Sequence, residues 1–168
     1  MTPKEFINAY LDDAKECERT TKIHHVATLT QAALESGWGK YAPGNMFFGI
    51  KDTDGVNGNE QLITTTEYTR SSKNPMPFPI STTPYVNKQG VKMFKHKGKD
   101  YFRKYPTPAD SFKDHSKFFF ENPRYKNALA VRGDYNKWFE ELQKAGYATD
   151  TNYSNTLKAV AKTIIKNL

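Results

Sequence analysis

Apolar side chains recur at intervals of three and four residues in two segments near the start of the chain. Residues 2–20 carry such a stripe and begin with a Thr, a Pro and a Glu three positions after the Thr, which is the spacing of a helix-starting capping box. Residues 23–36 carry a second stripe, and it stops at Gly37, a residue suited to the left-handed end of a helix. Both segments are predicted to be helices. After Pro108 the same period returns and predicts helices over residues 109–120, 124–131, 135–145 and from about 151 onward.

The middle of the chain has a different pattern. Residues 37–59 are rich in glycine and predict a loop, whereas the β-branched run at 62–69 predicts a strand. Residues 71–90 hold four prolines and are predicted to be an inserted loop, because proline excludes a central strand or helix. Short strands at 91–94 and 101–105 are expected to pair with the first strand. The expected class is α+β, mainly α, with residues 1–168 forming one domain and a small β-hairpin lobe at about 60–105.

Composition and charge narrow the class of protein. Hydrophobic residues make up 37% and aromatic residues 14% of 168 residues, which is typical of a folded chain. The single cysteine, Cys17, allows no internal disulfide and is expected to be a buried apolar side chain. The formal charge of +7 favours adsorption to polyanions such as nucleic acid, anionic membranes or the bacterial wall, but it selects none of them. No apolar run is long enough for a membrane span, and the N-terminus lacks the pattern of a secretion signal.

One carboxyl group stands out as a candidate acid. Glu35 lies near the C-terminal end of the second predicted helix, among apolar positions. Both the apolar surroundings and the negative end of the helix dipole favour its protonated form, which is what a general acid requires. The alternative is a glutamate that points into solvent. Glycoside hydrolysis usually employs a second carboxylate, and the candidates are Asp52, Asp54, Glu60 and Glu67. Of these, Glu67 stands on a predicted strand, where its direction is fixed.

Other catalytic chemistries find little support in the sequence. Cys17 is expected to lie on the apolar side of a helix, away from any histidine, which argues against a cysteine hydrolase. His24 and His25 are adjacent and are expected to point in different directions. No zinc-binding spacing and no glycine-rich phosphate loop occur, so no metal and no cofactor are expected.

Several segments together resemble glycoside hydrolase family 73, the glucosaminidases of bacterial autolysins and of the flagellar wall hydrolase. The chain has Gln-Ala-Ala-Leu-Glu-Ser-Gly-Trp-Gly-Lys at 31–40, Asn-Met-Phe-Phe-Gly-Ile-Lys at 45–51 and Thr-Thr-Thr-Glu-Tyr at 64–68. Further matches follow in family order at 101–105, 110–112, 122–125 and 142–150. Two departures are an extra residue within 45–51 and a longer hairpin after residue 68.

The resemblance implies a lysozyme-like fold and cleavage of the β-1,4 bond between N-acetylglucosamine and N-acetylmuramic acid. It implies that Glu35 is the general acid, that Glu67 is the second acidic residue and that Tyr147 belongs to the catalytic site. The residues expected to bind substrate are Trp38, Asn45, Phe48, Tyr68 and Tyr125. The substrate's own acetamido group remains an alternative to Glu67.

Other readings of the same residues stay open. An N-acetylmuramidase or lytic transglycosylase would share the fold and Glu35, and a non-catalytic wall-binding module would share the fold alone. A nucleic-acid binder has only the charge in its favour. The expected partner is the peptidoglycan glycan strand, bound by a monomer at the wall, in the periplasm or outside the cell. A phage endolysin and a secreted wall-degrading effector are both compatible with this sequence.

Overall fold

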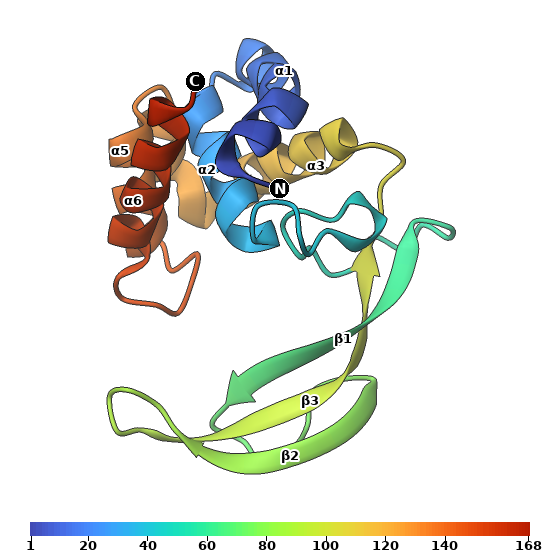
Figure 1. Cartoon of the computed structure of the whole chain (residues 1–168). Helices are drawn as coiled ribbons and strands as arrows, with labels where there is room; N and C mark the ends of the chain where they lie inside the picture. The colour runs from blue at the N-terminus through green and yellow to red at the C-terminus, as the bar shows by residue number, and fades with distance from the viewer. The chain divides into compact units, whose positions relative to one another are not determined.

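A computed structural model describes residues 1–168 as two compact units (Figure 1). The helical unit comprises residues 1–49 and 105–168, and the sheet unit comprises residues 50–104. The sheet unit is therefore inserted between two stretches of helical chain. The predicted α+β class with a predominance of helix is confirmed.

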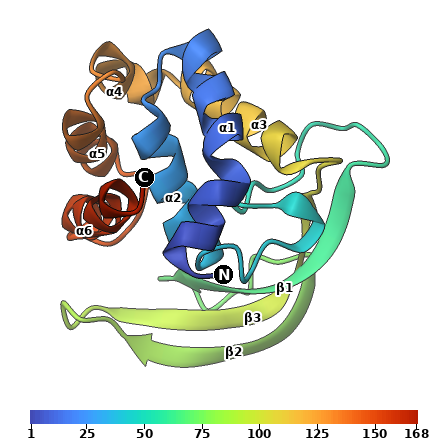
Figure 2. The ribbon, with the colours of Figure 1, turned by 45° about the horizontal axis from the view of Figure 1, so that its top comes forward.

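Six α-helices and two short 3₁₀ turns, η1 and η2, build the helical unit. Their bounds are α1 Pro3–Thr21, α2 His25–Ser36, η1 Pro43–Asn45, α3 Pro108–Glu121, η2 Pro123–Tyr125, α4 Lys126–Ala130, α5 Tyr135–Lys144 and α6 Tyr153–Lys166. Helix α2 packs against α1 on one side and against α5 and α6 on the other (Figure 2). It is thus the central helix of the core, and most of its residues are buried.

The ends of α1 and α2 form as the sequence predicts. The Thr2 side chain accepts a hydrogen bond from the Glu5 N–H, while the Glu5 carboxylate accepts one from the Thr2 N–H, so the capping box is complete. Gly37 ends α2 in the left-handed conformation, with φ of 58°. This sharp end places Glu35, two residues earlier, in the last turn of the helix.

The sheet unit is a three-stranded antiparallel sheet in the order β1-β3-β2. The strands are β1 Glu60–Thr69, β2 Phe78–Val86 and β3 Lys92–Arg103. Two predictions were wrong here, because residues 71–90 contain a strand and the two short strands at 91–94 and 101–105 are one long strand. β2 tolerates Pro79 and Pro84 because it lies at the edge, where one side of the strand needs no hydrogen-bond donors.

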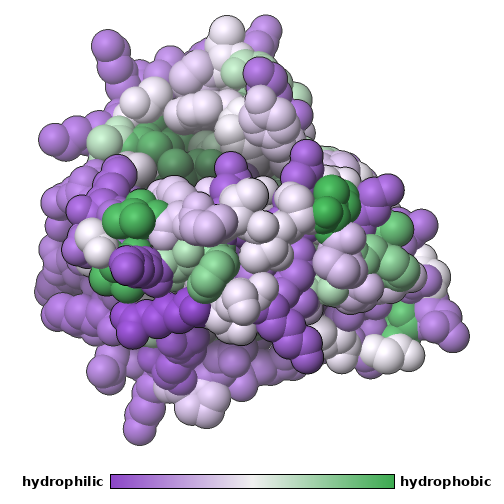
Figure 3. Space-filling view, turned by 90° about the horizontal axis from the view of Figure 1, so that it is seen from below, coloured by the Kyte–Doolittle hydropathy of each residue, from purple (hydrophilic) through white to green (hydrophobic).

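The surface is strongly polar. In Figure 3, hydrophilic residues cover most of the face shown and hydrophobic ones form separate patches. The mean hydropathy of −0.78 agrees with this. None of the helices is both long and apolar enough to cross a membrane. Cys17 is buried at 1% exposure, as predicted, and burial raises the pKa of its thiol to about 11.

Candidate active site

Glu35 is joined to the start of α6 by a tyrosine. The hydroxyl group of Tyr153 donates a hydrogen bond of 2.8 Å to Oε1 of Glu35. Tyr153 is the first residue of α6 and is only 5% exposed, so its ring is held by the core. One carboxylate oxygen of Glu35 is therefore occupied within the helical unit, and Oε2 has no hydrogen-bond partner there.

Burial raises the pKa of the Glu35 carboxyl group, and the hydrogen bond from Tyr153 opposes that shift. Glu35 is nevertheless open to solvent as a residue. The two observations are compatible, because a carboxyl group can face water on one side while protein atoms on its other sides remove much of its hydration. Desolvation on the protein side raises the proton affinity of the carboxyl group, since hydration of the charged form depends on all the surrounding space.

Tyr147 lies in the segment that connects α5 to α6. Its ring stacks on that of Tyr153, with centroids 5.6 Å apart, and Gly146 allows the preceding turn with a φ of 76°. Burial, and then the negative charge of Glu35, raise the pKa of Tyr147 well above its usual value. Tyr147 is thus a neutral hydroxyl group within the electrostatic influence of Glu35.

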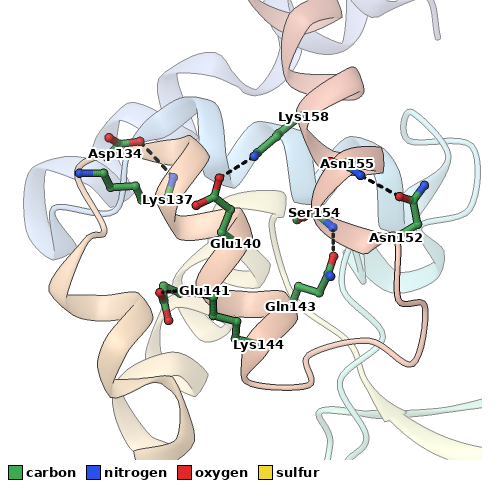
Figure 4. Close-up of polar contacts among 10 residues, drawn as sticks. All are labelled: Asp134, Lys137, Glu140, Glu141, Gln143, Lys144, Asn152, Ser154, Asn155 and Lys158. Carbon is green, nitrogen blue, oxygen red and sulfur yellow. Dashed lines mark hydrogen bonds and ion pairs between the residues drawn. The ribbon is translucent and has the colours of Figure 1, made fainter.

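Polar contacts between α5 and α6 hold the ends of this connecting segment. The side-chain oxygen of Gln143 accepts a 2.8 Å hydrogen bond from the Ser154 N–H, and Lys158 forms an ion pair of 2.7 Å with Glu140 (Figure 4). The first of these contacts lies directly beside Tyr153. The position of both tyrosines is therefore set by the α5–α6 pair.

A buried histidine supports Tyr147 from the side of α3. Nε2 of His115 lies 2.8 Å from the Tyr147 hydroxyl group. Burial lowers the pKa of His115 to about 3, so its imidazole is neutral over the physiological range. The ring of Phe48 stacks on that imidazole at a centroid distance of 3.7 Å. The sequence pattern does not reveal this contact, because it joins positions 32 residues apart.

Gln31 lies one helical turn before Glu35 and is also fully buried. Its Oε1 accepts a 3.2 Å hydrogen bond from the Trp138 indole N–H, and its side chain also hydrogen-bonds with the Tyr153 hydroxyl group. Gln31 therefore connects Trp138 to the tyrosine that donates to Glu35. Nothing in the helical periodicity of α2 distinguishes Gln31 from the apolar residues around it.

The second predicted acid, Glu67, belongs to the sheet unit. Its carboxylate forms a close ion pair with Lys51, and the Lys51 ammonium also lies 3.2 Å from Asp100. Partial burial opposes the charge on Lys51, but its hydrogen bonds to Glu67 and Asp100 raise its pKa. Lys51 is the last residue of the Asn-Met-Phe-Phe-Gly-Ile-Lys segment, so that motif delivers a cation to Glu67.

The residues expected to bind substrate have different environments. Tyr68 follows Glu67 on β1 and so faces the other side of the sheet, where it contacts Tyr85 at a centroid distance of 4.8 Å. Tyr125 is 2% exposed and packs on Phe119, so it belongs to the core. The role of Tyr125 in substrate binding stays a prediction, and the structure shows a packing role for its ring.

Three further residues that were expected to bind substrate lie in the segment that follows Glu35. Trp38 adopts a left-handed φ of 58° and its half-buried ring contacts Phe6. Asn45 also has a left-handed backbone, with φ of 56°, and its side-chain amide donates to the Tyr105 carbonyl. Phe48 is largely buried on His115. The extra residue in this segment is accommodated because Phe47 is buried too, at 3% exposure.

One cluster has donor atoms suitable for a metal ion. Ligand atoms of Glu18, His24 and His25 lie within 4.8 Å of one another. The two imidazoles stack at 4.5 Å, contrary to the expectation that they point in different directions. Oε2 of Glu18 already accepts hydrogen bonds from the His25 N–H and from Nδ1 of His25. These contacts cap α2 and account for the cluster, so we assign no metal to it.

Comparison with known proteins places the chain in a family. The chain matches the glucosaminidase family model, described as mannosyl-glycoprotein endo-beta-N-acetylglucosaminidase, over residues 11–166. It is 28% identical to the peptidoglycan hydrolase FlgJ of Vibrio parahaemolyticus, with 97% of this chain and 48% of that protein covered. It is 30% identical to the exo-glucosaminidase LytG of Bacillus subtilis, with 80% and 42% covered. The chain therefore spans about half or less of the length of these relatives.

A solved structure agrees with the sequence comparison. A C-terminally truncated glycoside hydrolase domain of FlgJ from Salmonella typhimurium aligns with a TM-score of 0.71 and 28% identity, with 98% of each chain covered. This likeness confirms the expected lysozyme-like fold. The chain belongs to the glucosaminidases of glycoside hydrolase family 73, and it is a glycoside hydrolase domain.

Proposed function

We propose that this domain hydrolyses peptidoglycan at the β-1,4 bond between N-acetylglucosamine and N-acetylmuramic acid, with Glu35 as general acid. The observation that carries the proposal is the desolvated Glu35 carboxyl group, whose pKa is raised by burial. The relatives named peptidoglycan hydrolase and exo-glucosaminidase support the choice of substrate. The domain then acts at the bacterial wall, in the periplasm or outside the cell.

The hydrogen bond from Tyr153 distinguishes the two oxygens of Glu35. Oε1 accepts from the tyrosine hydroxyl group, so the acid proton resides on Oε2, which has no partner within the helical unit. Protonation of the glycosidic oxygen by Oε2 releases the leaving sugar as an alcohol while positive charge develops on the other sugar. The Glu35 carboxylate that remains is stabilised by the Tyr153 hydroxyl group.

Tyr147 takes part as a neutral hydroxyl group. Its high pKa keeps the proton on oxygen, and His115 fixes that oxygen from behind at 2.8 Å. A hydroxyl group fixed in this way can donate to substrate or to a carboxylate without carrying charge itself. This is the role we assign to Tyr147, with Trp38 and Asn45 shaping the chain that follows Glu35.

Glu67 serves as the second carboxylate. In that role it stabilises the oxocarbenium-like transition state or activates water on the other face of the sugar. Its ion pair with Lys51 holds the carboxylate in one orientation on the strand. We expect Glu67→Gln to lower turnover by roughly 100-fold, which is within the usual contribution of a general base. A loss of less than about threefold would leave the substrate's acetamido group as the better candidate.

The experiment that tests the bond specificity is digestion of purified peptidoglycan followed by identification of the new reducing ends. Fragments that end in reducing N-acetylglucosamine support the glucosaminidase assignment. Reducing N-acetylmuramic acid would identify a muramidase, and a 1,6-anhydro end would identify a lytic transglycosylase. Tight wall binding without any release of fragments would identify a non-catalytic module.

We also propose that the domain belongs either to a phage endolysin or to a secreted wall-degrading effector. Both kinds of protein would use a catalytic domain of this kind as a monomer on glycan strands. The formal charge of +7 assists adsorption to an anionic wall in either setting.

A further inference from the structure

The central strand of the sheet unit carries a row of three lysines on one face. In the antiparallel register, Thr66 lies opposite Lys97 and Thr64 lies opposite Lys99, and Lys95 occupies the next position on the same side. Alternate residues of a strand are about 6.8 Å apart, so the three side chains rise from one face at that interval. All three lysines are exposed.

No carboxylate adjoins this row. The positions paired with the three lysines on the two neighbouring strands are Thr64, Thr66, Tyr68, Phe78, Ser81 and Thr83. None of the three lysines forms an ion pair, although other lysines do so, as in the pairs Lys51–Glu67 and Lys158–Glu140. The three like charges on alternate residues of one strand repel one another, and a bound anion would offset that repulsion.

The two faces of the sheet carry different charged groups. Asp100 alternates with the lysines along β3, and Glu67 on β1 lies opposite His96, which also alternates with them. Glu67 and Asp100 therefore lie on the other face, where both contact Lys51. The lysine face is therefore distinct from the face to which Glu67 belongs. A ligand of the lysine face would leave that ion-paired cluster untouched.

Exposed aromatic rings stand at both ends of the lysine row. Tyr68 and Tyr85 pair at 4.8 Å at one end, and Phe78 and Tyr101 pair at 5.8 Å at the other. Their residues are 39–48% exposed, which is unusual for four large rings on so small a sheet. Between these pairs the face offers lysines and the hydroxyl groups of threonine and serine.

We propose that this lysine face binds an extended phosphodiester polymer of the cell wall, of the polyol phosphate type. Successive phosphates would lie on Lys95, Lys97 and Lys99, with the neighbouring hydroxyl groups donating to phosphate and polyol oxygens and the ring pairs bounding the site. Sequence-tolerant binding of single-stranded nucleic acid instead uses rings interleaved with the cations, on which successive bases stack. Here each ring is already packed against another and none interrupts the row, which favours a polymer without bases.

Two triple variants distinguish binding at the lysine face from attraction by the overall positive charge. Lys95→Gln/Lys97→Gln/Lys99→Gln removes the row, and Lys15→Gln/Lys126→Gln/Lys166→Gln removes three exposed lysines of the helical unit. Each variant removes three positive charges from the same formal +7. The probe is soluble poly(glycerol phosphate), titrated by calorimetry at about 50 and about 200 mM salt.

The wild type is expected to bind the probe, more weakly at the higher salt concentration, because phosphate binding releases counterions. The face variant should lose about tenfold or more in affinity, whereas the control variant should stay within about twofold. Thermal melting of both triple variants checks that they fold. Glu35→Gln should bind the probe like the wild type, because binding of the probe does not depend on the catalytic proposal. Equal losses in the two triple variants, no binding by the wild type, or tighter binding of a single-stranded oligonucleotide with as many phosphates would overturn the proposal.

Discussion

The Tyr153 hydroxyl group donates a 2.8 Å hydrogen bond to Oε1 of Glu35 and so connects the start of α6 to the end of α2. Two opposing effects meet at this carboxyl group. Burial favours its protonated form, and the tyrosine hydrogen bond stabilises its ionised form. A general acid needs both, because it must hold a proton before the reaction and carry a charge after it.

Removing that hydrogen bond should raise the pKa of Glu35 further. Tyr153→Phe deletes the donor and keeps the ring, so burial is left as the main influence on the carboxyl group. The rate of a reaction that needs protonated Glu35 falls as pH rises through this pKa, so the alkaline limb of the pH–rate profile should move to higher pH in the variant. A profile measured on solubilised glycan would contradict this if the limb moved to lower pH. The variant should also lose about 1 kcal/mol of stability.

The same pKa shift makes a prediction about stability. Because the folded-state pKa of Glu35 is raised above its unfolded value, the folded protein binds more protons in the interval between the two values. This contribution is fully present below the unfolded pKa and is lost as pH rises through the folded pKa. Glu35→Gln removes the effect, so the variant should gain stability relative to the wild type as pH rises above about 4.5. Urea unfolding at a series of pH values measures the difference, and a constant difference would refute it.

His115 should make stability depend on pH in the opposite direction. Burial lowers its pKa to about 3, so the unfolded chain takes up a proton near the ordinary value of 6.5 while the folded chain does not. Stability attributable to His115 is present above 6.5 and decreases as pH falls toward 3, with a limiting slope of about 1.4 kcal/mol per pH unit. His115→Gln should flatten the stability profile across that interval. A variant that keeps the full slope of the wild type would show that other groups cause it.

Gly98 should be intolerant of a side chain. A Cβ at this buried position of β3 would lie 2.8 Å from the carbonyl oxygen of Phe78 and 2.9 Å from Sδ of Met76. The Phe78 oxygen belongs to the backbone of the paired edge strand, so relief requires movement of β2. We expect Gly98→Ala to cost about 1–3 kcal/mol. Gly133→Ala is the control, since nothing lies within 4 Å of its Cβ position, and equal losses in denaturant titrations of the two variants would contradict the prediction.

The helices were predictable because their signals are local. The capping box at Thr2 and the glycine after Ser36 act within one or two turns, and the helical period needs no partner to be read. β2 was missed because its two prolines exclude a central strand but not an edge strand, and the sequence does not reveal strand order. The single long strand β3 appeared as two because its lysines interrupt the apolar pattern that marks a strand.

The residues of the candidate site also fall into those that the sequence predicts and those that only the structure reveals. Glu35, Glu67 and Tyr147 were identified from the motifs that contain them, and their roles stay proposals. Tyr153 fitted the apolar stripe of α6 and gave no sign of its hydrogen bond to Glu35. His115 was overlooked because its neutral state results from burial, which depends on packing. For Tyr125 the motif suggested contact with substrate, whereas tertiary structure buries the ring.

The role of Glu35 as the general acid is tested by the rates at which the wild type and Glu35→Gln turn over purified peptidoglycan. Glu121→Gln, which removes an exposed carboxylate at the end of α3, is the control. We expect Glu35→Gln to lose at least about 100-fold in turnover and still to fold, because a general acid contributes that much. The control should retain the wild-type rate. Turnover by Glu35→Gln at the rate of the wild type would contradict the assignment of Glu35 as the acid.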